Sequence, residues 1–490
     1  MRRPLIPLSL LLVGCATAPA YRPPAVDVPP SFREAARDSL VRQRLGPAGA
    51  PGGGAAAESA APAAAPDGFW RELGDTVLTT LMDQALRANL DLQAADARLR
   101  GARAARAGAA LDLAPTVTFA SGYTRQRLST ATFPIGVGAF PDQDIWDGGF
   151  DASWELDLFG RLRRNLQAQG AFVAAAGEDL RDVRVSLAAE LARSYFDLRG
   201  AQEQLGVAQR NADNQRHTLD LTRDRLEAGQ GTAFDTERAQ AQLSLTLASI
   251  PTLEGRIAAA EYQIGVLLGR APASVAGTLD VGPGLPAFPD SVTVARPDSV
   301  VRRRPDVAAA ERLVAAQHAL VGSAKADYLP RLSVGASAGL TATTFDSLGK
   351  GGTFRYAVGP VISWPALNLG RVKAQVNAAQ AREAEAQAQY TQAVLRALQE
   401  VETSLARYRT ARVRVGRIQD AASASERAAE LARVRFTEGV ADFLQVLDAE
   451  RTLLDAQSQL SQARTDAATA YAALYKALGG AWPGGEGAGS

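Results

Sequence analysis

The sequence has little of what catalytic and nucleic-acid-binding proteins commonly use. Its 490 residues include one cysteine and two histidines, and aromatic residues make up only 6%. A formal net charge of +1 provides no basic field that would attract nucleic acid. No GxxxxGK[ST] loop, HExxH helix or GxSxG turn occurs. Nothing therefore indicates an enzyme, and we expect no cofactor, no metal and no nucleic-acid partner.

Long apolar runs are also absent, so we expect no transmembrane helix. The short apolar run at 5–13 follows two arginines and ends in Leu-Val-Gly before Cys15. This pattern is typical of a bacterial lipoprotein signal peptide, here residues 1–14, with Cys15 acylated as the new N-terminus. Ala16, rather than aspartate, follows it, which favours the outer membrane. No thiol then remains for a disulfide, a metal or a nucleophile.

What the sequence does contain is an internal duplication. The segment WELDLFGR at 154–161 returns as WPALNLGR at 364–371, and Gly229 returns as Gly439, both at an offset of 210 residues. This period is far too long for a solenoid of short repeats. It predicts two similar halves, and two similar walls suit a conduit better than a single asymmetric catalytic pocket.

Each half contains two segments in which apolar and polar residues alternate, giving hairpins at about 115–160 and 330–364. The four strands are roughly ten residues long, the length that crosses a bilayer when tilted. Two ordinary hairpins of a soluble domain would show the same alternation. If the strands cross a membrane, Asp151, Glu155, Asp157 and Arg355 line water, and Phe119, Tyr123, Trp154 and Tyr356 meet lipid.

Two long stretches between the hairpins predict helices. Residues 162–228 and 372–438 contain no proline, in a chain that has 25. Each helix would be ~100 Å long at 1.5 Å per residue, too long to be buried in one globule, so it must belong to a tube or bundle. Return helices follow at 232–268 and 442–478, and Pro251 is expected to kink or split the first of them.

The predicted organisation, in chain order, is a signal peptide 1–14, a lipidated tether 15–69 with no apolar period to bury, a first repeat 70–270 that opens with a helix at about 76–108, a linker 271–298, a second repeat 299–480, and a disordered tail 481–490.

Four strands are too few to close a barrel, since the smallest stable barrels use eight. An open edge cannot face lipid, because its unpaired N–H and C=O groups would each cost several kcal/mol. Several copies must therefore share one barrel. Two copies would give a plugged interior, whereas three would give twelve strands and a lumen. We predict an α+β membrane protein that forms a homotrimer with a twelve-stranded barrel, continued by a long α-helical tunnel.

A family resemblance rests on four segments: WELDLFGR at 154–161, RRPD at 303–306, residues 439–450, and LYKALGGAW at 474–482. With Cys15 and the duplication, they resemble the outer-membrane factor family, the TolC-type exit ducts. Within it, the chain is most similar to the lipidated, NodT-like subgroup that serves resistance-nodulation-division efflux pumps. The resemblance implies a trimer in outer-membrane lipid, a periplasmic tunnel, and docking of a periplasmic adaptor (membrane fusion) protein and an inner-membrane transporter.

The turns after the two long helices are the first candidate site. Gly229 and Gly439 are suited to cap the helices, because glycine adopts positive φ without strain. In the resembled family these tips receive the adaptor's helical hairpin. The matching residues are Arg225, Leu226, Gly229, Arg435, Phe436 and Gly439.

Acidic residues just past those turns are the second candidate site. Asp235, Asp442 and Asp448 lie near the starts of the return helices, where a negative charge favours the positive helix end. Threefold symmetry would turn each carboxylate that faces the pore into a ring of three that attracts cations and narrows the channel. The resemblance places Asp235 and Asp448 at such rings, with Gln445 where some relatives have a second aspartate. Which ring is tighter stays open.

The predicted function is a passive exit channel of a tripartite efflux pump, carrying drugs or other small molecules. One alternative is the outer-membrane duct of a type I protein secretion system. An alternative of another class is a soluble periplasmic coiled-coil adaptor or scaffold. The loops at about 128–145 and 341–353 contain no pattern that indicates a substrate.

Overall fold

The structure is a computed structural model that describes residues 21–35, 37, 69–127, 142–279, 284–289, 292 and 294–480. Cys15, the predicted signal peptide, most of the tether and the predicted tail lie outside the described residues.

The chain forms two compact units. The sheet unit comprises residues 1–25, 98–177 and 309–391, and the helix unit comprises 26–97, 178–308 and 392–490. Neither unit corresponds to one sequence repeat, because each combines segments from both halves of the chain.

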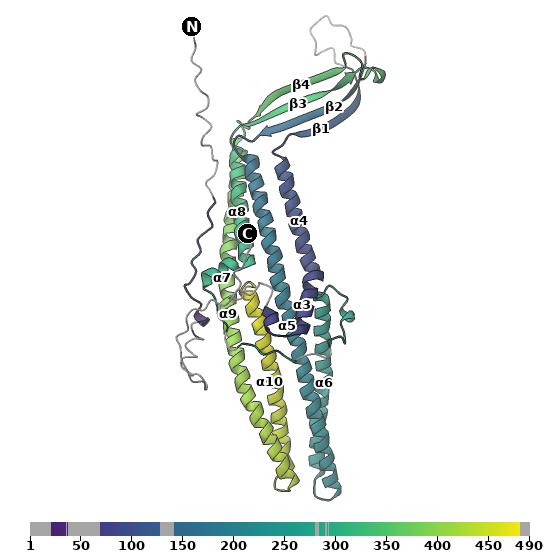
Figure 1. The fold of residues 1–490 in the computed structure, drawn as a ribbon, viewed down its shortest axis with the longest axis vertical. Helices are drawn as coiled ribbons and strands as arrows, with labels where there is room; N and C mark the ends of the chain where they lie inside the picture. The colour runs from purple at the N-terminus through teal and green to yellow at the C-terminus, as the bar shows by residue number, and fades with distance from the viewer. Residues whose placement is uncertain are drawn as a thin grey trace. The chain divides into compact units, whose positions relative to one another are not determined.

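The sheet unit contains four antiparallel strands in the order β1-β2-β3-β4 (Figure 1). They are β1 (Thr116–Gln126), β2 (Gln143–Leu156), β3 (Arg331–Ala342) and β4 (Phe354–Ser363). The four strands expected from the alternating pattern are thus confirmed. Because β2 of the first repeat pairs with β3 of the second, the sheet joins the two halves of the duplication.

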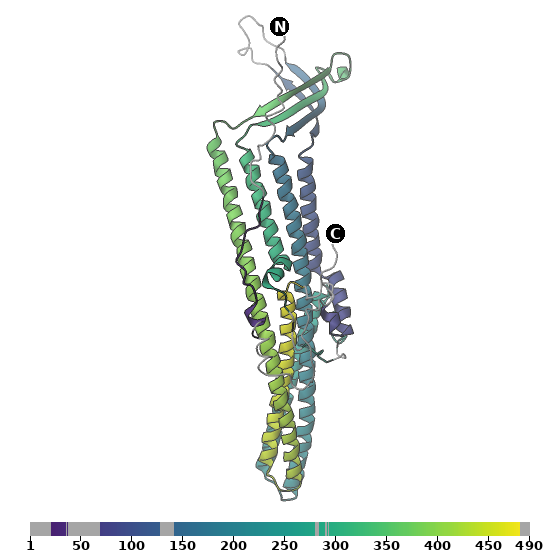
Figure 2. The ribbon, with the colours of Figure 1, turned by 60° about the vertical axis from the view of Figure 1, so that its left-hand side comes forward.

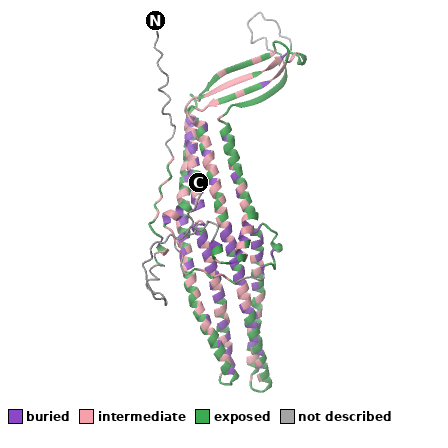
Figure 3. Cartoon of the chain, in the orientation of Figure 1, coloured by how far each residue is buried: buried purple, intermediate pink, exposed green. Residues whose placement is uncertain are grey.

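The register separates the side chains onto an apolar and a polar face, since successive strand residues point to opposite sides. Phe119 lies opposite Phe150, and Ala338 lies opposite Tyr356. Phe119 and Tyr356 are 63% and 75% exposed, and much of the sheet is coloured as exposed in Figure 3. The apolar face therefore covers no core within the described chain.

Four helices join the same end of the sheet, because the strands alternate in direction (Figure 2). They are α4 (Leu90–Leu111), α5 (Arg161–Glu227), α8 (Pro305–Ala326) and α9 (Leu369–Thr437). At this end of the sheet, equivalent tryptophans of the two repeats make equivalent hydrogen bonds. The indole N–H of Trp154 donates to the carbonyl of Leu113 at 2.9 Å, and that of Trp364 donates to Tyr328 at 3.0 Å.

The helix unit contains two helical hairpins (Figures 1 and 2). The first is formed by α5 and α6 (Ala233–Leu267), and the second by α9 and α10 (Phe443–Ala477). The helices α5 and α9 have 67 and 69 residues. Pro251 lies inside α6, which is continuous, so of the two expected outcomes, a kink or a split, the split is wrong.

The prediction of a single helix at about 76–108 is also wrong. The structure has two helices there, α3 (Thr76–Ala88) and α4, with Asn89 between them. Asn89 is buried, and its side-chain amide donates to the carbonyl of Leu267 at 3.0 Å. Its side-chain oxygen accepts the N–H of Leu92 at 3.0 Å, which caps the start of α4. The apolar period continues through this cap, so the period alone does not reveal the break.

The core of the helix unit surrounds fully buried aromatic residues, among them Trp70 of α2 (Phe69–Glu72), Tyr195 and Tyr471. The hydroxyl of Tyr195 donates to Asp75 at 2.6 Å. Burial, and then this hydrogen bond, raise the pKa of Tyr195 to about 12. The tyrosine is therefore neutral at physiological pH and closes a polar contact inside an apolar core.

Residues of the predicted tether and of the predicted linker pack onto this core. Phe32, in the predicted tether, is only 3% exposed and belongs to the core, although no apolar period in this segment indicated burial. Phe288, in the predicted linker, packs edge-on against Phe196 with ring centroids 5.4 Å apart. The linker ends in α7 (Pro297–Arg303). None of the described helices has an apolar stretch long enough to cross a lipid bilayer.

Candidate functional site at the hairpin turns

The two hairpin turns have the same capping geometry. Gly229 and Gly439 have φ values of 70° and 72°. The N–H of Gly229 donates to the carbonyl of Leu226, and the next N–H donates to Arg225. The N–H of Gly439 donates likewise to Phe436, and the next N–H to Arg435. Both are Schellman caps, which confirms that these glycines end their helices.

Two of the predicted docking residues contact each other across the hairpins. The Arg225 guanidinium donates to the carbonyl of Phe436 at 3.1 Å and lies 4.5 Å from the centre of its ring. Phe436 is only 6% exposed and packs against Phe443 of α10. In this conformation Arg225 and Phe436 hold the two turns together, and the Phe436 ring offers no surface to a partner.

Other apolar residues at the turns are exposed, and the sequence analysis did not select them. Val440, directly after the capping glycine, is 66% exposed, and Phe234 at the start of α6 is 63% exposed. Leu444, which matches Phe234 at the repeat offset, is exposed as well, and so is Leu226, which the sequence did predict as a docking residue. Apolar residues are uncommon in a polar turn, and this was the signal that could have found them.

Two of the predicted acidic residues take part in helix capping. Thr232 is the N-cap of α6, and its hydroxyl donates to Asp235 at 2.6 Å. Asp442 is itself the N-cap of α10, and its carboxylate accepts the N–H of Gln445 at 3.0 Å. Both carboxylates therefore stabilise the starts of the return helices.

Asp448 differs from these two capping residues. It lies six residues after Asp442, on α10, and is exposed. Among the described residues, no donor forms a hydrogen bond or ion pair with its carboxylate. Its charge is therefore available to water or to a solute. At the repeat offset, α6 has Arg238 in place of Asp448, so the first hairpin has the opposite charge there.

A buried carboxylate beside these turns was missed by the sequence analysis. Glu450 is 3% exposed and accepts hydrogen bonds from Thr218 of α5 at 3.0 Å and from Arg433 of α9 at 2.8 Å. In the first hairpin the matching pair is Arg223 and Gln240, joined at 3.1 Å. Glu450 thus links α5, α9 and α10. Comparing the two repeats residue by residue is what could have revealed it.

The side of α5 that carries Thr218 is polar over several turns. Asn211, Gln215 and Thr222 are all buried. Asn211 donates to Gln457 of α10 at 2.9 Å. Both polar atoms of the Gln215 amide, and one oxygen of Glu450, have no hydrogen-bond partner among the described residues. We call these residues, with Glu450, the polar seam, and its incomplete hydrogen bonding makes it a weaker interface than an apolar one.

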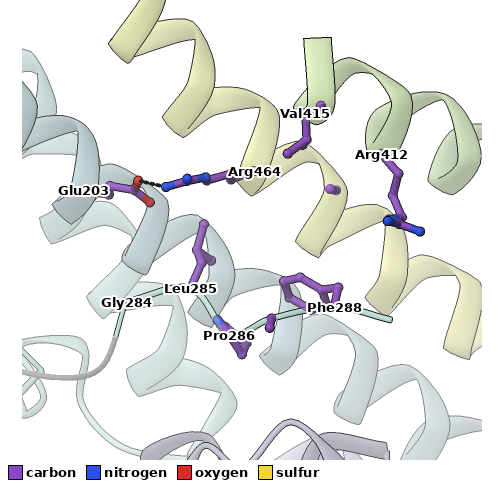
Figure 4. Close-up of a pocket in the computed structure, with 11 residues that line it drawn as sticks. Glu203, Gly284, Leu285, Pro286, Phe288, Arg412, Val415 and Arg464 are labelled. Carbon is purple, nitrogen blue, oxygen red and sulfur yellow. Dashed lines mark hydrogen bonds and ion pairs between the residues drawn. The ribbon is translucent and has the colours of Figure 1, made fainter. Parts of the chain in front are cut away.

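A cavity of about 590 Å³ lies where the linker crosses the helices (Figure 4). Leu285 and Phe288 of the linker and Val415 of α9 form its apolar walls. Arg464 of α10 also lines it and donates to Glu203 of α5 at 3.0 Å. The walls come from distant parts of the chain, so no local sequence pattern indicated this cavity.

Comparison with known proteins assigns the chain and its fold to a family. The model of the outer membrane efflux protein family matches residues 81–270 and 297–480. The pyoverdine export outer membrane protein OpmQ of Pseudomonas putida is 30% identical over 98% of this chain and 97% of its own length. The Nodulation protein T of Rhizobium leguminosarum bv. trifolii is 27% identical over 96% of this chain and 95% of its own.

Solved structures agree with these matches. The outer-membrane channel OprN superimposes with a TM-score of 0.82 and 36% identity, covering 95% of this chain and 99% of its own. The open state of the MtrE outer membrane channel of Neisseria gonorrhoeae superimposes with a TM-score of 0.80 and 26% identity, covering 94% of this chain and 97% of its own.

The chain belongs to the outer membrane efflux protein family. It is an outer-membrane efflux channel that extends into the periplasm. The expected family resemblance is confirmed, and the alternative of a periplasmic coiled-coil adaptor or scaffold is wrong.

Proposed function

We propose that three copies of this chain form a passive exit duct of a tripartite efflux pump. The observation that carries this proposal is the four-stranded sheet, which exposes an apolar face. Its two edge strands, β1 and β4, each have a single hydrogen-bonded neighbour within the described chain, so both edges of the sheet are open. A lipid-exposed sheet edge is not tolerated in hydrocarbon. Three sheets joined β1 to β4 give twelve strands, enough to close around a lumen.

The hairpin turns would receive the periplasmic adaptor. Leu226, Phe234, Val440 and Leu444 supply exposed apolar surface there, and the caps at Gly229 and Gly439 hold the turns in a fixed form. A helical hairpin of a partner binds such a surface through its own apolar face. Arg225 and Phe436 would act indirectly, by keeping the two turns adjacent.

Asp448 would form the narrowest ring of the closed duct, with Asp235 and Asp442 contributing charge beside it. Its carboxylate is exposed, whereas those two carboxylates serve as helix caps. Opening would separate α10 from α5 along the polar seam. The chain has no nucleotide-binding motif, so the energy would come from an inner-membrane transporter.

Small molecules are the substrate class that the relatives support. Their names include a pyoverdine export protein and, in Pseudomonas putida, a toluene efflux pump outer membrane protein. The type I protein secretion duct remains the alternative, and the transporter that co-purifies with the chain distinguishes the two. Cys15 would be acylated, which mass spectrometry of the mature N-terminus tests directly.

Single-channel recording in planar lipid bilayers tests the duct and its constriction together. The wild-type protein should insert as a trimer, and Asp448→Ala should raise its conductance because three charges leave the narrowest ring. Glu438→Ala, an exposed carboxylate in the turn itself, is the matched control and should leave conductance unchanged. A monomer that never inserts would contradict the duct. Equal conductance of wild type and Asp448→Ala would contradict only the ring.

A further inference from the structure

The polar face of the sheet has an uneven distribution of charge. Its charged residues within the strands are Asp147, Asp151 and Glu155 of β2, Arg331 of β3, and Arg355 of β4. Glu155 accepts two hydrogen bonds from Arg161, at 3.0 and 2.7 Å, and Arg331 donates to Asp327 at 2.7 Å. These pairs leave Asp147, Asp151 and Arg355 to determine the charge of the rest of this face.

Arg355 neutralises Asp147 by reaching across a whole strand. It lies on β4 and donates to the Asp147 carboxylate on β2 at 2.9 and 2.7 Å, passing over β3. Gly339 and Gly149 lie beside Arg355 in the same row of the sheet. A Cβ built on Gly149 would lie 2.7 Å from the carbonyl oxygen of Ala338, so the two backbones are too close for a side chain. The paired glycines leave the space that the long arginine side chain crosses.

Asp151 forms no such ion pair, although the positive charge of Arg355 also acts on it over a longer distance. It is exposed, and among the described residues no side chain forms a hydrogen bond or ion pair with its carboxylate. Its neighbours in the same row are Thr118, Ser337 and Ala357, which are small and uncharged. Two carboxylates and one guanidinium therefore leave one net negative charge per chain on this part of the face.

We infer that Asp151 gives the interior of the duct a negative potential that favours cationic over anionic solutes, and that Arg355 limits this potential by neutralising Asp147. The inference rests on the proposed function, because only a shared barrel places the polar face around water. Three copies would set three Asp151 carboxylates at one level of the lumen, and a charge facing a narrow water-filled space concentrates ions of opposite sign. Arg355 is a positioning residue here, since it acts chiefly through Asp147, to which it donates both hydrogen bonds.

Cysteine accessibility tests the inference at the site itself, independently of any constriction elsewhere. Cys15 is the only cysteine in the sequence, so the unmodified chain provides the blank. Ser337→Cys places a thiol in the same row as Asp151, and Ala338→Cys places one on the opposite face. Membrane-inserted trimers are treated with methanethiosulfonate reagents of similar size that carry one positive or one negative charge.

The thiol at 337 should react faster with the cationic reagent than with the anionic one. Asp151→Asn should lower this rate ratio by roughly threefold, and Arg355→Gln should raise it by a similar factor, because one charge acts on both reagents across a few ångströms of water. Asp147→Asn combined with Arg355→Gln should restore the original ratio. Asp346→Asn, in the exposed β3–β4 turn, is the matched control and should change nothing.

The outcomes separate the inference from the proposed function. If Ser337→Cys reacts but its rate ratio does not depend on residue 151, the inference is wrong and the duct stands. If Ala338→Cys reacts with these water-soluble reagents as fast as Ser337→Cys, the polar face does not line the water path, and the proposed duct fails.

Discussion

The two repeats of this chain agree in their backbone and differ in their charges. Both form a helical hairpin with a Schellman cap, and both fix a tryptophan indole to the carbonyl of the preceding helix end. At matching positions, however, the first hairpin has Arg238 and Gln240, and the second has Asp448 and Glu450.

The two repeats thus share a backbone scaffold, and the carboxylates of Asp448 and Glu450 have no counterpart in the first hairpin. Backbone caps depend on local geometry that two copies can share. Charges near the turns act across hairpins and, in a trimer, across copies, so the two repeats need not carry the same ones. The second hairpin contains the exposed Asp448 and the buried Glu450, and it is the hairpin that the proposed opening would move.

The largest effect is expected where the two repeats meet, between β2 and β3. Gly149→Ala places a Cβ 2.7 Å from the carbonyl oxygen of Ala338, which should cost roughly 1–3 kcal/mol per chain or prevent assembly. The measurement is the yield of heat-stable trimer on a gel. Gly335→Ala is the control, because a Cβ there meets nothing within 4 Å. Equal trimer yields for the two variants would show that the close approach is unimportant.

The next largest effect is expected at Glu450 of the polar seam, which is a carboxylate where the first repeat has the neutral Gln240. Glu450→Ala leaves Arg433 and Thr218 without their shared acceptor and should destabilise the helix unit by about 2 kcal/mol, because the pair is only partly shielded from water. Gln240→Ala, the same change in the first repeat, should cost roughly 0.5 kcal/mol or less. Thermal unfolding in detergent measures both, and similar losses would remove the distinction between the hairpins.

A smaller and equal effect is expected at the two caps. Gly229→Ala and Gly439→Ala each force a side chain into positive φ and should cost about 1 kcal/mol. Hydrogen exchange of the last turns of α5 and α9 reports the fraying of each helix separately. A clearly larger change at one turn would mean that the turns are not equivalent.

The smallest effect depends on pH. Burial, and then the neighbouring Asp306, raise the pKa of Asp182 in α5 above its usual value. Because the folded-state pKa lies above the unfolded one, the stability that this group contributes is full at acid pH, below the unfolded value, and declines as pH rises toward the folded value. Asp182→Asn should therefore raise the melting temperature slightly at pH 7 and leave it unchanged near pH 3.

The second repeat provides the control for this prediction. It has Gln392 at the position of Asp182, so Gln392→Asn should have no pH-dependent effect. A gain in stability from Asp182→Asn that is the same at both pH values would contradict the assigned cause.

Much of the fold could be predicted from the sequence, because the signals were local and periodic. The four strands follow from alternation, and the long helices run from Arg161 and Leu369 where proline is absent. Asn89 shows the limit of this reasoning, because its capping role depends on a carbonyl of α6 that lies far away in the sequence. Phe32 is similar, since one apolar residue in a polar stretch gives no periodic signal.

The candidate site was predictable only in part. The capping glycines and Asp442 act on their own helix ends, and their positions in the sequence identified them. That Phe436 is buried under Arg225 could not be predicted, since the two residues come from different hairpins. Val440 and Phe436 are both apolar and lie in the same turn, and it is the packing of the hairpins that leaves Val440 exposed and buries Phe436.

By itself, the amino-acid sequence determined the duplication, the order of helices and strands, and the residues that cap each turn, because these depend on neighbours within a few positions along the chain. Only the tertiary structure decided which charges are paired. Asp147 forms an ion pair with an arginine two strands away, Asp151 forms none among the described residues, and Glu450 is buried beside α5. Electrostatic partners are set by distance in space, and residues far apart in a sequence become neighbours only when the chain has folded.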